Sequence, residues 1–357
     1  MYYITVGENV VAPNSDKLNP PIPRKERPSD QHQKHYMLYP LQVDSLPNLV
    51  SAIIEGRNPD VVPINDIYNN SFAIHPPSRC KRPLGILILI KTCFQNKLKR
   101  DALRETWANS QYLSRLVVPV EYAFILGHGI YNSTSVKEEF MKEVTIMGDI
   151  IVSNFVDTYR NNTFKSLAGL HWGIEHCKDY EFLLMMDDDM YLSLHNLITF
   201  LRQPSTYPKR SNPEIKGKYG FEIPGSQIFW GGYVYSEPVH PKRDPSNKWY
   251  VTWDQYPFKT FPNVVPGGAI IYSRNVTQQF VLASPFVKHL NLDDVFLCLI
   301  AAKLFIKPFR MNKFILNKWV WNPRWPDKVK ETNVIAVHDI ESTPKMIEFW
   351  KKYERGI

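Results

Sequence analysis

Short apolar runs rich in branched residues alternate with helical patterns along the chain from residue 84 onward. Four runs have the length and composition of buried β-strands. They are residues 84–90, 121–126, 149–155 and 181–186. Between the last two, apolar residues recur at helical spacing, with Asn162 or Thr163 placed to cap the first turn. This alternation predicts an α/β fold in which helices flank a mainly parallel central sheet.

The first 77 residues differ in composition from the rest of the chain. They hold 11 of the 28 prolines, and proline removes a backbone donor and fixes φ against regular structure. We expect residues 1–77 to form a proline-rich stem, ordered locally around residues 46–54, and residues 78–357 to form the main domain. No run approaches the roughly 18 apolar residues of a membrane-spanning helix, and the start at Met1 lacks a signal-peptide pattern.

Composition excludes a wholly disordered chain. Of the 357 residues, 44% are hydrophobic and 13% are aromatic, which is far above what disordered chains carry. The 43 basic and 35 acidic residues give a formal net charge of +8.

Sequons and cysteines bear on the cellular compartment. Four Asn-X-Ser/Thr sequons favour the secretory pathway. They begin at Asn69, Asn132, Asn161 and Asn275. The cysteines are Cys80, Cys93, Cys177 and Cys298. None of them forms the close pair that zinc ribbons and redox motifs need, so buried thiols and one or two disulfides both remain open.

Three consecutive carboxylates, Asp187, Asp188 and Asp189, follow the fourth strand. Oxygen ligands at the carboxyl edge of a parallel strand suit a divalent cation such as Mn²⁺ or Mg²⁺. Alternate residues of an extended backbone share a face, so Asp187 and Asp189 can reach one ion while Asp188 points away. A solvated acidic loop is the alternative, but the position directly after a buried strand favours the metal site.

A second acidic pair, Asp293-Asp294, precedes an apolar segment that predicts a buried helix. Asp293 suits the N-cap or the first turn of this helix. The functional alternative is that one carboxylate of the pair, close to metal and substrate, acts as a general base on an acceptor hydroxyl. The spacing alone does not decide between these interpretations.

Six elements in chain order resemble motifs of the inverting β1,3-glycosyltransferases, a group with β1,3-galactosyltransferases, β1,3-N-acetylglucosaminyltransferases and the insect protein Brainiac. The elements are RDALRETW (100–107), DTYRNNTFKS (157–166), LLMMDDDMYL (183–192), the stretch from KWYV to IIYS (248–273), DDV (293–295) and HDIESTPKMIEFW (338–350). The resemblance implies a GT-A-type fold for residues 78–357. It also implies transfer of a sugar from a UDP-sugar to the 3-hydroxyl of an acceptor, with inversion to a β1,3 linkage.

The resemblance implies roles for individual residues. Asp187 and Asp189 match the motif that holds Mn²⁺ or Mg²⁺ on the donor diphosphate, and Asp294 matches the catalytic base. His338 matches a histidine that can complete the metal shell, with a core or surface histidine as the alternative. The residues expected to contact the donor are Arg100, Arg104, Asp157, Lys165, Asp187 and Asp188. Structural or surface ion pairs are the alternative for the basic ones.

The donor sugar stays open, because one pocket contact decides it. The breadth of the family favours UDP-galactose, with a glycan acceptor on glycolipid or glycoprotein. The run at residues 255–258 and the Asp-Asp-Val helix resemble Brainiac, which implies N-acetylglucosamine transfer to a glycosphingolipid. The family also implies a type II membrane protein in the Golgi lumen, although no anchor is visible in this sequence. A catalytically inactive, lectin-like relative is the hypothesis from another class.

Residues 303–330 hold eight basic residues and one acid, with interleaved aromatics. This is the pattern of a single-stranded nucleic-acid platform. We nevertheless expect no nucleic-acid partner, because the sequons and the acidic triplet have no place in such a protein. A solvated face, or a surface that attracts UDP-sugar and glycolipid, is the preferred interpretation.

Overall fold

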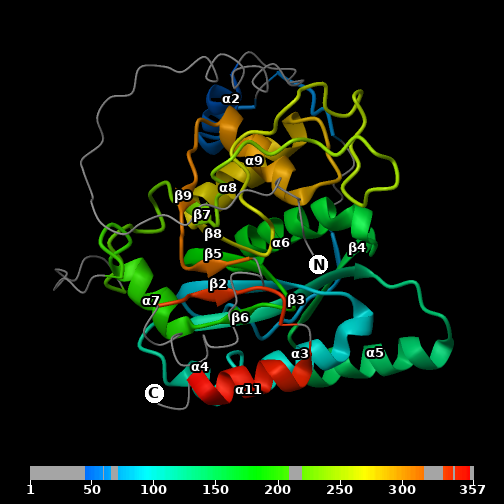
Figure 1. Ribbon diagram of the computed structural model, residues 1–357, viewed down its shortest axis with the longest axis vertical. Helices are drawn as coiled ribbons and strands as arrows, with labels where there is room; N and C mark the ends of the chain where they lie inside the picture. The colour runs from blue at the N-terminus through cyan, green and yellow to red at the C-terminus, as the bar shows by residue number, and fades with distance from the viewer. Residues whose placement is uncertain are drawn as a thin grey trace.

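A central sheet of eight strands lies between two layers of helices in the computed structural model (Figure 1). The described residues are 45–58, 60–65, 71–208, 219–316, 333–340 and 342–353. The strand order is β1-β4-β3-β2-β5-β8-β7-β9. Its strands are β1 (Phe72–Ile74), β2 (Leu84–Lys91), β3 (Val120–His128), β4 (Ile150–Val156), β5 (Tyr180–Asp187), β7 (Trp230–Gly232), β8 (Ala269–Ser273) and β9 (Phe309–Arg310). Strands β2 to β5 pair in parallel, while β8 runs antiparallel to β5. The predicted α/β fold with a mainly parallel central sheet is confirmed.

All four strands expected from the apolar runs are present, as β2, β3, β4 and β5. Strand β2 is buried along its whole length. Its leucines belong to one hydrophobic core and its isoleucines to the other, because successive side chains of a strand point to opposite faces. Burial on both faces explains why these strands are continuous apolar runs.

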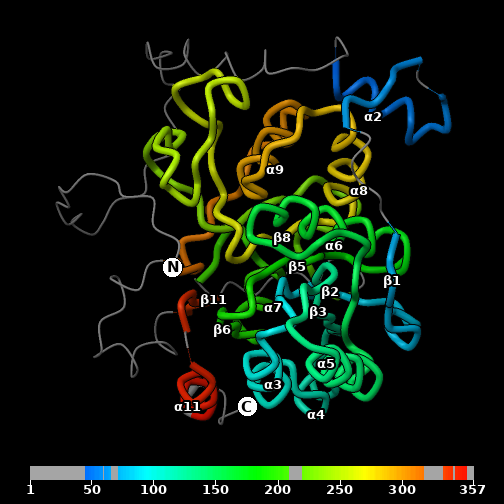
Figure 2. The backbone as a smooth tube through the Cα atoms, turned by 90° about the vertical axis from the view of Figure 1, so that its right-hand side faces the viewer, coloured from blue at the N-terminus to red at the C-terminus, as the bar shows by residue number. Residues whose placement is uncertain are grey.

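Each face of the sheet has its own layer of helices (Figure 2). One layer contains α2 (Leu46–Ile54), α6 (Asn162–His176), α8 (Arg274–Ala283) and α9 (Asp293–Lys303). The opposite layer contains α3 (Lys97–Glu105), α4 (Ser110–Ser114), α5 (Thr134–Met147), α7 (Leu194–Arg202) and α11 (Thr343–Tyr353). Among the described residues, no helix is long and apolar enough to cross a membrane.

The predicted caps of α6 are wrong. The N-cap is Asn161, which makes no side-chain cap bond, and Asn162 is already the first helical residue. Thr163 instead donates its hydroxyl to the carbonyl of Leu290 at 2.7 Å. A long-range anchor therefore replaces the local cap, which the sequence spacing did not reveal.

Two elements from the expected stem belong to the body of the fold. Helix α2 confirms the local order around residues 46–54, and it buries Leu46, Leu49 and Val50 in the core next to α8. Strand β1 pairs with β4 in the central sheet. A boundary at residue 78 thus falls between two strands of one sheet.

A small second sheet carries the C-terminal part of the chain toward the triplet of aspartates. Its strands are β6 (Tyr191–Leu192), β10 (Phe314–Ile315) and β11 (Ala336–Val337), in the order β10-β11-β6. Val337 pairs with Tyr191 across β11 and β6. This register brings His338 beside Asp189, although the two residues are far apart in the sequence.

One disulfide joins Cys80 to Cys177, with 5.0 Å between their Cα atoms. The other two cysteines are free thiols, with Cys93 half-buried and Cys298 buried. The sulfur of Cys298 accepts a hydrogen bond from the backbone N–H of Val265 at 3.3 Å. The Cys298 sulfur therefore contacts the chain that leads into β8.

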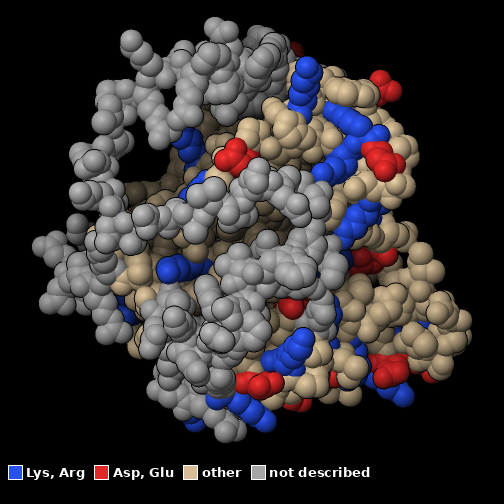
Figure 3. All heavy atoms as spheres, in the orientation of Figure 1, with Lys and Arg blue, Asp and Glu red and all other residues tan. Residues whose placement is uncertain are grey.

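The basic stretch at residues 303–330 lies partly outside the described residues, which stop at 316 and resume at 333. Within the described part, Lys303 is only 1% exposed, so it does not belong to a solvated face. Lys and Arg are interspersed with Asp and Glu over the described surface in Figure 3.

Candidate active site

Two adjoining pockets open where β2 and β5 end. We name them the polar pocket and the aromatic pocket, and they share Lys91, Tyr159, Asn162 and Asp187. The polar pocket is further lined by Thr92, Cys93, Gln95, Asn96, Lys99, Asp157, Thr158, Lys165, Asp188 and Asp189. The aromatic pocket is further lined by Tyr235, His240, Lys242, Trp249, Phe261, Pro266, Gly267, Gly268, Asn291, Leu292, Asp293, Asp294, Val295, Leu316 and His338. Ligands of open α/β sheets bind outside the carboxyl ends of the strands, and both pockets lie there.

Asp187, Asp189 and His338 form a group that can hold a metal ion. One ligand atom from each lies within 4.8 Å of the others. Oδ1 of Asp189 is buried, lies 3.5 Å from Nε2 of His338, and makes no hydrogen bond within the described part of the chain. Carboxylate oxygens with one imidazole suit Mn²⁺, so the donor set fits the ion that the resemblance implies.

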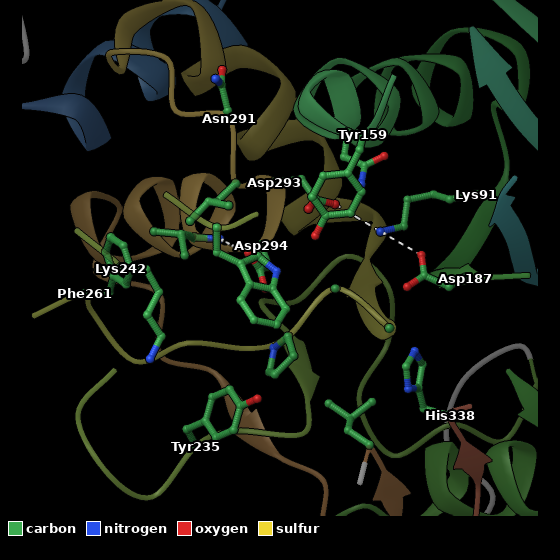
Figure 4. A pocket seen from close by; sticks show the side chains of 18 of the residues that line it. Lys91, Tyr159, Asp187, Tyr235, Lys242, Phe261, Asn291, Asp293, Asp294 and His338 are labelled. Atoms are coloured by element: carbon green, nitrogen blue, oxygen red, sulfur yellow. Dashed lines mark hydrogen bonds and ion pairs between the residues drawn. The ribbon is translucent and has the colours of Figure 1, made fainter. Parts of the chain in front are cut away.

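Lys91 joins the metal group to the acidic pair. Its Nζ lies 3.1 Å from Oδ1 of Asp187 and 3.0 Å from Oδ2 of Asp293 (Figure 4). Burial opposes the charged form, but these two carboxylates raise the pKa of Lys91. Burial also raises the pKa of Asp187 to about 6, against the effect of Lys91. The lysine is thus a permanent cation between two buried acids.

The two aspartates at the start of α9 differ in their surroundings. Burial works against ionisation of Asp293, but Lys91 and the Ser166 hydroxyl, which donates at 2.7 Å, lower its pKa. Burial and the neighbouring charge of Asp293 raise the pKa of Asp294 to about 7. The N-cap of the helix is Leu292, so Asp293 occupies the first turn. Asp294 is the member of the pair suited to accept a proton near neutral pH.

Asp188 points away from the metal group, as the alternation predicts. It accepts hydrogen bonds from Thr92 Oγ1 at 2.6 Å and Asn96 Nδ2 at 2.7 Å, and Lys99 Nζ lies 3.1 Å from it. These contacts fix the loop after β2 against the end of β5. The carboxylate therefore shapes the wall of the polar pocket.

Lys165 and Asp157 meet in the wall of the polar pocket. Nζ of Lys165 lies 2.8 Å from Oδ1 of Asp157 and donates to the carbonyl of Thr92 at 2.7 Å. Asp157 also accepts from the N–H of Gly127 at 3.1 Å. Two expected donor-contact residues are thus brought together at this pocket.

Arg100 and Arg104 do not line either pocket. Arg100 is fully buried, where it forms a two-point ion pair with Glu143 and donates to the carbonyl of Cys93 at 2.6 Å. Arg104 pairs with Asp149 and Glu143. Both guanidinium groups pair with protein carboxylates away from the two pockets, which favours the structural alternative for these arginines.

Sequence reasoning missed Lys91, Tyr159 and Trp249. Lys91 had a signal, since it is a charged residue at the end of an otherwise apolar central strand. Nζ of Lys248 lies over the rings of Tyr159 and Trp249, at 5.2 and 4.6 Å from their centroids. The contact between Lys248 and Tyr159 depends on tertiary packing, so spacing in the sequence could not find it.

Glycine lets the backbone approach the charged groups. A methyl group on Gly267 would lie 3.2 Å from Nζ of Lys91. The carbonyl of Gly268 accepts from the N–H of Asp187 at 2.9 Å. The turn before β8 therefore lies directly against Lys91 and Asp187, between the metal group and the acidic pair.

Residues 98–312 match the sequence profile described as Galactosyltransferase. The chain belongs to the galactosyltransferase family. This membership confirms the family inferred from the six elements, and it implies a nucleotide-sugar donor and a glycan acceptor.

Several galactosyltransferase relatives are similar over most of this chain. Beta-1,3-galactosyltransferase 1 of Mus musculus is 30% identical over 290 residues, which are 81% of this chain and 79% of the relative. Lactosylceramide 1,3-N-acetyl-beta-D-glucosaminyltransferase B of Danio rerio is 32% identical over 246 residues, 68% of this chain and 60% of the relative. Beta-1,3-galactosyltransferase brn of Drosophila melanogaster is 28% identical over 271 residues, which are 76% of this chain and 75% of the relative. These names place the chain among β1,3-glycosyltransferases that transfer galactose or N-acetylglucosamine.

Two solved structures of glycosyltransferases are similar at low scores. Apo mouse xyloside xylosyltransferase 1 has a TM-score of 0.31 and 11% identity, covering 74% of this chain and 99% of that one. A glycosyltransferase involved in glycosylation of the major capsid of PBCV-1 has a TM-score of 0.37 and 12% identity, covering 74% of this chain and 98% of that one.

Proposed function

We propose that the chain is an inverting β1,3-galactosyltransferase of GT-A type, which transfers galactose from UDP-galactose to the 3-hydroxyl of an acceptor sugar. One observation carries this proposal. The Asp187–Asp189–His338 group and the base candidate Asp294 line adjoining pockets, with Lys91 between them. A site that stabilises a leaving diphosphate then lies beside one that takes a proton from an attacking hydroxyl.

The polar pocket is the proposed site of the donor nucleotide. Asp187, Asp189 and His338 would hold Mn²⁺, which supplies Lewis-acid stabilisation to a departing diphosphate when it is bound. Lys99 and Lys165 line the same pocket and supply positive charge near the nucleotide. Among the expected donor contacts, Asp157 and Asp188 orient these two lysines.

The aromatic pocket is the proposed site of the acceptor sugar. Asp294 would take the proton of the 3-hydroxyl as the oxygen attacks the anomeric carbon from the face opposite the diphosphate. One displacement converts the α-linked donor sugar to a β-linked product. Tyr159, Tyr235 and Trp249 offer faces on which a sugar ring can pack.

Transfer of N-acetylglucosamine is the second candidate, supported by the similarity to the zebrafish lactosylceramide enzyme. The experiment is a matrix of UDP-galactose, UDP-N-acetylglucosamine and UDP-N-acetylgalactosamine against acceptors that end in galactose, N-acetylglucosamine or mannose. We expect UDP-galactose to give the fastest transfer, with the Asp294→Asn variant as the control for spontaneous hydrolysis. A β1,3 product made only from UDP-N-acetylglucosamine would replace the galactose assignment. Binding of UDP without transfer from any donor would favour the lectin-like alternative.

We further propose that the protein works in the Golgi lumen at the membrane surface. The Cys80–Cys177 disulfide and the four sequons support this location, because disulfides persist in oxidising compartments. The acceptor would then be a glycan on glycolipid or glycoprotein.

A further inference from the structure

The sequon that begins at Asn132 lies on the surface connection between β3 and α5. Asn132, Ser133 and Thr134 are all exposed. The hydroxyl of Ser133 caps α5 by accepting from the N–H of Val136 at 3.3 Å. Within the described part of the chain, the side-chain amide of Asn132 makes no hydrogen bond. Its nitrogen is therefore open to solvent.

The sequon at Asn161 is built into the fold. The amide of Asn161 donates to the carbonyl of Val156 at 2.7 Å, which ties the end of β4 to the start of α6. Thr163, the hydroxyl residue of this sequon, is 1% exposed. Asn162, the next residue, lines both pockets. A glycan here would replace one of the two hydrogens on this tethered nitrogen and add bulk between the end of β4 and the start of α6, next to the pockets.

The sequon at Asn275 is also engaged. The amide of Asn275 donates to the carbonyl of Ser226 at 2.9 Å, and its oxygen accepts from Gln279 at 2.5 Å. Thr277 is fully buried and donates to the carbonyl of Ser273 at 3.0 Å. The asparagine thus fastens the segment before β7 to the first turn of α8, and a bulky substituent would separate them.

We propose that, of these three asparagines, Asn132 carries an N-linked glycan in the folded protein, and that Asn161 and Asn275 do not. This inference rests on the luminal location proposed above. All sequons are accessible in the unfolded chain, so the native surroundings decide which modified chains can fold. Asn69 lies outside the described residues and is removed in the test.

The covalent step uses a lipid-pyrophosphate-linked oligosaccharide as the co-reactant. Nδ2 of Asn132 forms a bond to the anomeric carbon of the first N-acetylglucosamine. The bond between that carbon and the pyrophosphate oxygen breaks, and the lipid pyrophosphate leaves with the electron pair. The amide proton passes to solvent, so the carboxamide remains neutral.

The test uses the full chain with Asn69→Gln, secreted from animal cells behind a cleavable signal sequence, with a reporter sequon appended after Ile357. Peptide-N-glycosidase digestion in heavy-oxygen water converts each glycosylated asparagine to a labelled aspartate. Mass spectrometry should find the label at position 132 and at the reporter, and not at 161 or 275. This measurement needs no substitution at the three sites, so it does not depend on the folding of a variant.

Matched variants sharpen the result. Asn132→Gln and Thr134→Ala should each remove one glycan from the secreted protein, while Ser135→Ala should keep it. Label at 161 or 275, or an unmodified Asn132 beside an occupied reporter, would overturn the proposal. Sugar transfer measured on the same secreted protein reports the proposed function independently, and Asn132→Gln should leave its rate unchanged.

Discussion

The polar pocket and the aromatic pocket differ in the surroundings of their carboxylates. In the polar pocket, each carboxylate away from the metal group has a donor, as when Asp188 meets Thr92, Asn96 and Lys99. In the aromatic pocket, Asp294 lies beside a second carboxylate, and its pKa rises to about 7. The first arrangement holds fixed charges in place, whereas the second prepares one group to change its charge.

The origin of the two pockets explains this difference. The wall of the polar pocket comes from the ends of parallel strands, the loops that follow them and the first turns of α3 and α6. The aromatic pocket is closed by the start of α9 and by long connections around residues 235–268. Four predictions test the separate roles of the two pockets, beginning with the largest expected effect.

Asp189→Ala should abolish sugar transfer and Mn²⁺-dependent UDP binding together. We expect a loss of about 10³-fold or more, because Lewis-acid stabilisation is worth several kcal/mol. Isothermal titration with UDP, with and without Mn²⁺, measures binding beside the transfer assay. Asp188→Asn is the control, since its side chain points away from the metal group, and it should keep Mn²⁺-dependent binding. Undiminished wild-type activity in excess EDTA would contradict the metal assignment.

Asp294→Asn should lower kcat by about 10²–10⁴-fold, the usual contribution of general-base catalysis, while UDP affinity stays the same. Asp293→Asn removes half of the ion pairing of Lys91, so we expect its main effect on stability. Side-by-side measurement of kcat, UDP affinity and thermal unfolding separates the two roles. The roles are reversed if Asp293→Asn proves inactive and Asp294→Asn turns over normally.

Arg100→Met should lower the free energy of unfolding by about 3–5 kcal/mol, because it leaves Glu143 buried with a missing partner. Lys99→Met is the matched control. Lys99 is partly exposed, so its loss should cost about 1 kcal/mol or less, while UDP affinity falls. Chemical denaturation and UDP titration on both variants measure the contrast. Arg100→Met with normal stability and weak UDP binding would restore the donor-contact hypothesis.

The pH profile should have the smallest effect, about tenfold per pH unit. The base must be ionised, so kcat/KM should rise with pH up to about 7 and then level off. Removing the charge of Asp293 with Asp293→Asn should move the midpoint to lower pH, since that charge helps raise the pKa of Asp294. Rates at saturating Mn²⁺ from pH 5 to 9 test this, and a wild-type midpoint near the ordinary aspartate range would contradict it.

The central sheet could be predicted from the sequence because its strands are buried on both faces. Continuous apolar runs such as Leu84–Lys91 then identify themselves. Strands β9, β10 and β11 have two residues each, which is too short for any periodicity. They exist because tertiary packing brings them together, so a single-sequence pattern could not reveal them.

The candidate site was predicted in part, because a local pattern can be read from the sequence whereas contacts between distant residues cannot. Alternation along an extended chain predicts that Asp187 and Asp189 share a face, and ligand atoms of these two residues lie close together beside His338. The partners of Arg100 and Arg104 lie 43 and 45 residues away in sequence, at Glu143 and Asp149. Sequence motifs do not tell whether a guanidinium meets a phosphate or a protein carboxylate, and here the protein supplies the carboxylates.

The Cys80–Cys177 bond closes the chain between these two cysteines into a covalent ring. The ring contains β2, β3, β4 and all of α6, so Thr92, Asp157 and Lys165 lie within it. In the chain-entropy estimate, a loop of about 100 residues disfavours the unfolded state by about 4.7 kcal/mol. A single backbone cleavage inside the ring leaves both fragments joined, whereas a cleavage after Cys177 and before α9 detaches Asp294 and His338 covalently. The part of the polar pocket wall from Thr92 to Lys165 is thus tied by bonds. The three aspartates after β5 and the proposed base on α9 are held against it by packing.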